Sequence, residues 1–163
     1  NIFFVVGNHE LANRYGDQFI SKIRELGVIL LDNQSKVIDV NGDKINIAGM
    51  GFYASKEDYE KTIDNIDDNN YTILLSHGPN RPIEYSSGME DLILSGHTHG
   101  GQVRLPLIGA IVAPGQRFFP EYDKGTFDLG NTILYIDSGL GNSVFPIRFL
   151  NRVQISNITI QLT

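Results

Sequence analysis

LILSGHTHGGQ, residues 92–102, places two histidines inside a glycine-framed loop directly after an apolar run. In an extended chain, residues i and i+2 project to the same side, so we expect His97 and His99 to face one cavity. The glycines lack a Cβ and let the backbone turn sharply and approach a ligand closely. Imidazole commonly binds Zn, Fe and Mn ions. A lone His-x-His pair also occurs as two histidines that share no ligand, so the rest of the chain has to decide.

The chain has four histidines, and each follows an apolar, strand-like run within a few residues. They are His9, His77, His97 and His99, and each has a glycine nearby. This placement predicts that all four lie in loops and none on a helix. In open α/β sheets, ligands gather at the carboxyl ends of the strands. We therefore expect separate strands to deliver the four imidazoles to one edge of a sheet.

The apolar pattern predicts an α/β domain. Ile2–Val6 is a continuous run of β-branched and aromatic residues, which is typical of a strand covered on both faces. Asn41-Gly42 separates two alternating segments and predicts a tight hairpin. We expect helices at 17–26 and 56–66, and strands at 28–31, 36–40, 44–48, 71–76, 91–95, 109–114, 126–129 and 132–137, followed by an alternating tail at 153–163 with a break near 156–157.

Composition excludes several classes of protein. The 163 residues are 41% hydrophobic and 20% charged, which fits one globular domain. There is no cysteine, so any metal must be held by nitrogen and oxygen ligands. A net charge of −6 without a Lys/Arg block argues against a nucleic-acid partner. No apolar run approaches the ~18–20 residues of a membrane helix, and the sequence has neither a Gly-x-Ser-x-Gly motif nor a P-loop.

Three motifs in a fixed order resemble the calcineurin-like metallophosphoesterases. The motifs are Gly7-Asn8-His9-Glu10, Ser76-His77-Gly78 and Gly96-His97-Thr98-His99. The longer string SGHTHGGQVRLP (95–106) resembles the bacterial branch that includes the YkuE-type and YaeI-type phosphoesterases, as do residues 138–141 and 146–149. The resemblance covers essentially the whole chain. It implies an α/β fold in which a β-sandwich of two mixed sheets is flanked by helices.

The resemblance also implies roles for individual residues. Asn8, His77 and His97 would bind one divalent ion, and His99 would bind a second. His9 would be no ligand but a general acid or charge stabiliser near the leaving group. Two ions (Mn, Fe or Zn) ~3.5–4 Å apart would clamp the attacking and leaving oxygens of a phosphate ester, with a metal-bound hydroxide as nucleophile. Because this branch is associated with membranes, we favour a diester or a lipid-linked or envelope-related phosphate ester over a simple monoester.

The sequence departs from the family pattern at its start. The family's Asp-x-His and Gly-Asp blocks precede the GNHE loop, but only six residues precede Gly7 and none is acidic or His. We therefore expect residues 1–163 to be the C-terminal portion of a single metallophosphoesterase domain that is truncated at its N-terminus. The parent chain would be the hydrolase, and this part alone would bind at most one metal loosely. Its location would be cytoplasmic, or membrane-associated through a segment upstream.

Two further expectations concern the surface. Arg104 would donate two hydrogen bonds to substrate phosphate or else form a surface salt bridge, and Tyr122 would line the substrate pocket or else only pack. A truncated sheet would expose an edge at Ile2–Val6, which predicts self-association of the fragment. Glu10 would either bond a histidine or favour the start of a helix.

An alternative function remains open. The chain could be a non-catalytic metal-binding or protein-interaction module on the same scaffold. The absent ligand blocks favour this alternative, whereas the presence of Asn8 and all four histidines favours the enzyme.

Overall fold

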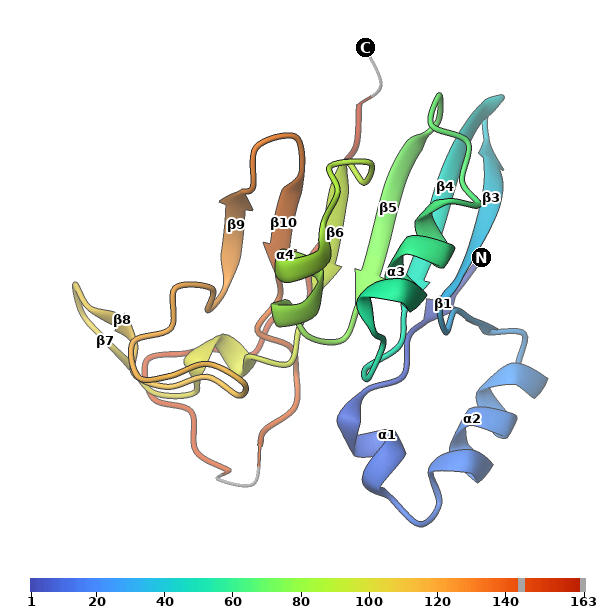
Figure 1. Ribbon diagram of the computed structural model, residues 1–163. Helices are drawn as coiled ribbons and strands as arrows, with labels where there is room; N and C mark the ends of the chain where they lie inside the picture. The colour runs from blue at the N-terminus through green and yellow to red at the C-terminus, as the bar shows by residue number, and fades with distance from the viewer. Residues whose placement is uncertain (144–145, 162–163) are drawn as a thin grey trace.

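A six-stranded mixed sheet forms the centre of the computed structural model, which describes residues 1–143 and 146–161 (Figure 1). The strand order is β3-β4-β5-β6-β10-β9. The four inner strands are mutually parallel, and the two outer strands are antiparallel to their neighbours. The predicted α/β class is confirmed. The strands are β3 (Gln34–Val40), β4 (Asp43–Met50), β5 (Tyr71–Ser76), β6 (Leu92–Ser95), β9 (Gly125–Asp128) and β10 (Ile133–Ile136).

Two short strand pairs lie outside this sheet. β1 (Phe3–Phe4) is parallel to β2 (Ile29–Leu30), and β7 (Arg104–Leu105) is antiparallel to β8 (Gly109–Ala110). Figure 1 shows α3 and α4 against the sheet, while α1 and α2 lie beyond the edge where the parallel strands end. The helices are α1 (Asn8–Ala12), α2 (Gly16–Glu25), α3 (Lys56–Ile63), α4 (Asn80–Tyr85) and the 3₁₀ turn η1 (His99–Gly101).

The core lies between α3 and one face of the sheet. Alternate residues of a strand point to the same face, and on this face Leu74, Ile93 and Leu134 are fully buried. Tyr59 and Ile63 of α3 pack into the same cluster. The residues of β5 that point to the other face are only partly buried. Helix α3 therefore anchors the parallel strands whose ends form the site.

The strand predictions are mostly confirmed, with three differences. The strand predicted at 109–114 is shorter, since only Gly109–Ala110 forms a strand there. β1 is not covered on both faces, since Phe3 and Phe4 are half-buried and Ile2 is 66% exposed. The short β1–β2 pair simply has no layer on its outer side. The tail forms no strand over 153–161 and is joined to β10 by side-chain contacts, as when Gln154 Nε2 donates to the Tyr135 hydroxyl (2.7 Å). Residues 162 and 163 of the predicted tail lie outside the described residues.

The predicted hairpin joins β3 to β4. Asn41 and Gly42 have φ of 59° and 98°, and Val40 pairs with Asp43 across them. Two positive φ values suit the two-residue turns that match the right-handed twist of strands. Both predicted helices also form, although α3 stops at Ile63, earlier than expected. Among the described residues, no helix combines the length and apolar character needed to cross a membrane.

Gly49 in β4 allows Leu31, which directly follows β2, to lie close to the β4 backbone. A Cβ at Gly49 would lie 2.2 Å from Leu31 Cβ and 2.9 Å from the Leu31 carbonyl oxygen. We expect Gly49→Ala to lower the free energy of unfolding by about 1–3 kcal/mol, because Leu31 is buried and its backbone must shift. Urea denaturation measures this, with Gly141→Ala as control because a Cβ there meets nothing within 4 Å. Equal stability of the two variants would contradict the prediction.

Candidate metal centre

Three donor atoms from distant parts of the chain converge at the carboxyl edge of the sheet. His77 follows β5 and His97 follows β6, two adjacent parallel strands in which Ser76 pairs with Ser95. His77 Nε2 lies 3.0 Å from His97 Nδ1 and 2.8 Å from Asn8 Oδ1. Asn8 comes from the start of α1. The structure thus brings together the three residues that the sequence assigned to one ion.

The chemistry of this donor set suits a divalent transition metal. Imidazole nitrogen binds Zn, Fe and similar ions, and oxygen ligands suit Mn and Mg. Among the residues that the structure describes, no group of three or more His, Cys, Asp or Glu side chains is placed to hold a metal. The set of three therefore depends on the Asn8 amide oxygen beside the two imidazoles, and these donors fit one ion better than two.

Close packing fixes the two imidazoles. A Cβ on Gly7 would lie 2.5 Å from the His77 ring, so only glycine fits there. The Phe52 ring lies edge-on to both His77 and His97, with centroid distances of 5.5 Å. Such edge-to-face contacts prefer a defined orientation. The rings are thus held in place by the protein itself.

Electrostatics keep the imidazoles neutral. Burial lowers the pKa of His77 and lowers that of His97 to about 4, and nearby histidines oppose a positive charge on each ring. Burial also lowers the pKa of His99. A neutral imidazole has one nitrogen lone pair available to a metal. At neutral pH these side chains can therefore act as ligands without first losing a proton.

His99 is oriented by a different set of contacts. The extended geometry expected for His97 and His99 is wrong, because their φ values are 67° and 51° and His99 begins the turn η1. His99 Nδ1 lies 3.2 Å from the Gly141 carbonyl oxygen. A ring N–H bonded to a backbone carbonyl leaves Nε2 as the nitrogen for a ligand. His99 is therefore held by other contacts than the three donors. Like His77 and His97, it presents a neutral ring nitrogen to a ligand.

Comparison with known proteins supports this interpretation of the edge. The sequence model of the family described as calcineurin-like phosphoesterase matches residues 1–101, which include Asn8, His77, His97 and His99. The chain belongs to the calcineurin-like phosphoesterase family. The resemblance first noted from the three motifs is thereby confirmed, and the expected fold class with it.

Individual relatives of this calcineurin-like phosphoesterase chain agree. The uncharacterized metallophosphoesterase YkuE of Bacillus subtilis is 32% identical over 162 residues, covering 98% of this chain and 56% of YkuE. Phosphodiesterase YaeI of Escherichia coli is 27% identical over 156 residues, covering 94% of this chain and 56% of YaeI. The chain thus spans about half the length of these relatives. The sulfate thiohydrolase SoxB from Thermus thermophilus shares the fold, with a TM-score of 0.52, 14% identity and coverage of 83% of this chain and 27% of SoxB.

Arg148 of this calcineurin-like phosphoesterase chain bonds the backbone beside His99, a contact that the sequence did not reveal. Its guanidinium donates to the carbonyl oxygens of Ser138 (2.7 Å), Gly139 (3.1 Å) and Gly141. The Gly141 carbonyl is the group that faces His99 Nδ1. Residues 146–149, which include Arg148, were noticed as a family-like segment. Because the partners of Arg148 include the His99 carbonyl oxygen (3.5 Å), 49 residues away in sequence, only the fold reveals these contacts.

We expect Arg148→Ala in the full-length protein to lower the affinity for one of the two Mn²⁺ ions by about 10–100-fold. Without the Arg148 guanidinium, the Gly141 carbonyl and the His99 ring are no longer held in place. Arg148→Lys would recover little, since an ammonium lacks the planar fork of donors. Metal titration followed by electron paramagnetic resonance measures this. Arg152→Ala is the matched control, because Arg152 is exposed nearby. If Arg148→Ala binds both Mn²⁺ ions with unchanged affinity, Arg148 does not orient His99.

His9 differs from the expectation of a loop position, whereas Glu10 takes the helix-start alternative. Both lie on α1, because Gly7 caps this short helix and its N–H donates to Glu10 Oε2 (2.9 Å). Glu10 therefore stabilises the helix start. The His9 side chain is exposed and lines a small cavity with Glu10. His9 directly follows the donor Asn8 on the same helix. Its role as general acid remains a prediction.

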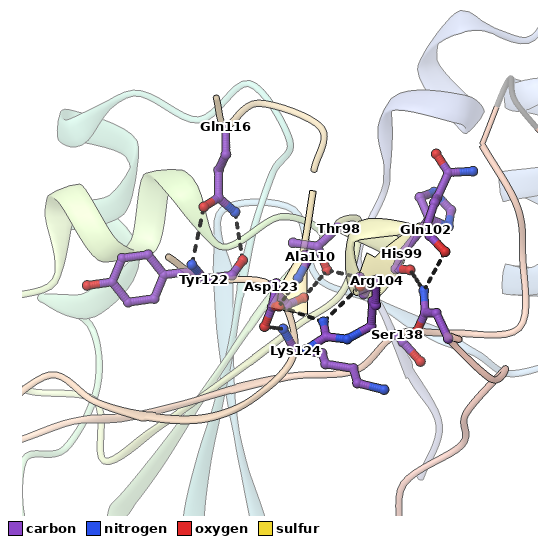
Figure 2. A network of polar contacts seen from close by, with 12 residues as sticks. Thr98, His99, Gln102, Arg104, Ala110, Gln116, Tyr122, Asp123, Lys124 and Ser138 are labelled. Atoms are coloured by element: carbon purple, nitrogen blue, oxygen red, sulfur yellow. Dashed lines mark hydrogen bonds and ion pairs between the residues drawn. The ribbon is translucent and has the colours of Figure 1, made fainter. Parts of the chain in front are cut away.

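The two predicted substrate residues have structural partners (Figure 2). Arg104 Nη1 lies 2.5 Å from Asp123 Oδ2 and donates to the Gly100 carbonyl (3.0 Å). The Tyr122 ring packs edge-on against Phe127, and Gln116 bonds the backbone of Tyr122. Tyr122 thus packs, as the alternative prediction had it, whereas the Arg104 ion pair is mostly buried and not the expected surface salt bridge. Their binding of substrate remains a prediction, and nothing in these contacts supports it.

Proposed function

We propose that the protein hydrolyses phosphate esters with the help of divalent metal ions. The observation that carries this proposal is that His77 Nε2 lies 2.8 Å from Asn8 Oδ1 and 3.0 Å from His97 Nδ1, in a chain of the calcineurin-like phosphoesterase family. Asn8, His77 and His97 would hold one ion and His99 a second. When bound, such ions polarise a phosphoryl oxygen and activate water.

The chain's own residues would supply orientation and charge. His77 and His97, held by Phe52 and Gly7, fix where a phosphate group would lie. Exposed His9 would stand beside the leaving group and donate a proton to it or stabilise its charge. These roles follow from the positions of the residues and from the family, and they remain part of the proposal.

The identity of the metal and the class of ester are also part of the proposal. We infer Mn, Fe or Zn as the metal from the nitrogen and oxygen donors. A phosphodiester or a lipid-linked or envelope-related ester is favoured over a simple monoester, since YaeI is named a phosphodiesterase. Self-association through the Ile2–Val6 edge and the cellular location remain predictions.

Hydrolysis of bis(4-nitrophenyl) phosphate with Mn²⁺ tests the proposal. Residues 1–163 should be compared with a chain extended upstream, because the present chain spans 56% of YkuE. We expect strong activity in the extended chain and little in residues 1–163, since only His99 is assigned to the second ion. Such a result would also support the interpretation of residues 1–163 as the C-terminal portion of one domain. Hydrolysis by neither chain with any of Mn²⁺, Fe²⁺ or Zn²⁺ would contradict the proposal and favour the non-catalytic module.

A further inference from the structure

A cavity of about 210 Å³ lies beside His97, and the proposed hydrolysis does not use most of the residues around it. The His97 ring forms part of the wall. Phe52 and Tyr53, from the segment after β4, form another part, and Asn80 and Arg81 at the start of α4 form a third. Its volume is below the ~300–1,000 Å³ of pockets for drug-sized ligands. The cavity therefore suits one small group, such as a single ring.

The aromatic wall offers a stacking surface. The Phe52 ring lies edge-on to His97 and also to Tyr53, with a centroid distance of 4.9 Å to the latter. Tyr53 is nevertheless 70% exposed. Phe52 thus links the Tyr53 ring to the metal centre, and the exposed face of Tyr53 remains accessible to a planar ligand. Aromatic pairs of this kind gain energy beyond the burial of area alone.

Arg81 supplies a positive charge to the cavity. Its guanidinium carbon lies 5.7 Å from the Phe52 ring centroid and 5.8 Å from that of Tyr53, and one N–H donates to the Phe52 carbonyl. Among the described residues that line the cavity, Arg81 alone is an Arg, Lys, Asp or Glu. A guanidinium has five N–H donors. A ligand with an oxygen acceptor would therefore meet a charge-assisted donor here.

Glycine keeps the cavity walls close together. Gly115 has a φ of 73°, and a Cβ there would lie 2.3 Å from Asn80 Nδ2, which donates to the Gly115 carbonyl (3.0 Å). A Cβ on Gly78 would lie 3.3 Å from the His97 ring. A larger residue at Gly115 would displace Asn80, and one at Gly78 would crowd the His97 ring. The shape of the cavity is thus built into the loops that follow β5 and β8.

We propose that this cavity binds the alcohol part of the phosphate ester, as a planar ring that carries an oxygen acceptor. The inference rests on the proposed function, because it places the phosphate group at Asn8, His77 and His97. The ring stacks on Tyr53, and its oxygen accepts a hydrogen bond from Arg81. Substrates with small alkyl alcohols leave the cavity unfilled and bind more weakly.

Binding of phosphonates, which such an enzyme does not hydrolyse, tests the inference. The full-length protein loaded with Mn²⁺ is titrated calorimetrically with methylphosphonate, phenylphosphonate and 4-carboxyphenylphosphonate. We expect phenylphosphonate to bind about tenfold more tightly than methylphosphonate, and the carboxylate to add about another tenfold. Tyr53→Ala and Tyr53→Leu should lose the first difference, and Arg81→Ala the second. Affinity for methylphosphonate should stay within about twofold, which shows that the variants are folded.

Matched controls lie outside the cavity. Phe118 is 74% exposed, close to the value for Tyr53, and Arg117 is an exposed arginine. Phe118→Ala and Arg117→Ala should retain both differences. If the unmodified protein hydrolyses esters but binds all three phosphonates equally, the cavity proposal is wrong and the hydrolase proposal stands. If it neither binds a phosphonate nor cleaves an ester, both proposals are wrong.

Discussion

His97→Ala should lower kcat/KM for bis(4-nitrophenyl) phosphate by about 1,000-fold in the full-length protein, or about 4 kcal/mol of transition-state stabilisation. His97 Nδ1 lies 3.0 Å from His77 Nε2, so its removal deletes one of three donors to the first ion. The same change removes the His97 ring from the wall of the cavity that Phe52 also lines. Mn²⁺ affinity should fall together with activity, because both depend on this nitrogen.

The control for His97→Ala is Arg117→Ala, which alters an exposed side chain outside the site. Circular dichroism before and after heating checks that the variant folds. Because His97 is held in a neutral, half-buried state, its loss should cost little stability in the absence of metal. Activity within tenfold of the unmodified protein, with unchanged metal affinity, would exclude His97 as a ligand.

The second large effect concerns stability. Asp123→Ala should lower the free energy of unfolding by about 2–3 kcal/mol, because it leaves the Arg104 guanidinium without its counter-ion. The two side chains are only 20% and 14% exposed, and Asp123 also accepts from the Ala110 and Lys124 backbone N–H groups. Figure 2 shows these contacts together. Urea denaturation measures the effect.

Two comparisons isolate this ion pair. Asp43→Ala removes an exposed aspartate at the start of β4 and should change stability by less than about 0.5 kcal/mol. The double variant Asp123→Leu with Arg104→Met should recover part of the loss, because no unpaired charge then remains buried. If Asp123→Ala and Asp43→Ala are equally stable, Arg104 and Asp123 do not stabilise the loop after η1.

The sequence was a good guide to where the site lies. His77 and His97 each follow a strand, and parallel neighbours end at the same edge, so their meeting follows from topology. The conformation of the loop could not be predicted in the same way. Thr98 is fully buried and donates to the Asp123 carbonyl (2.6 Å), a contact across 25 residues. Such distant contacts, not local spacing, hold His97 and His99 at positive φ.

The remaining differences also arise from contacts distant in sequence. Arg104 was a reasonable phosphate ligand by charge, but Asp123 pairs with it, and the pattern of charges alone does not show which acid is nearby. His9 was expected in a loop, yet Glu10 bonds the Gly7 N–H and extends a helix to include it. Phe52, Tyr53 and Arg81 carry no motif. They gain a proposed role only because β4 ends, and α4 begins, beside His97.

The separation of the three donors along the chain has a consequence for folding. His77 and His97 are 20 residues apart, but Asn8 and His77 are 69 apart, and Asn8 belongs to the part of the chain whose strands pair outside the six-stranded sheet. Contacts at long sequence separation form late, because the chain must first lose the entropy of a large loop. We therefore expect β5 and β6 to bring the imidazoles together early and the asparagine to arrive last. Acquisition of tight metal binding during refolding would then mark the final kinetic step.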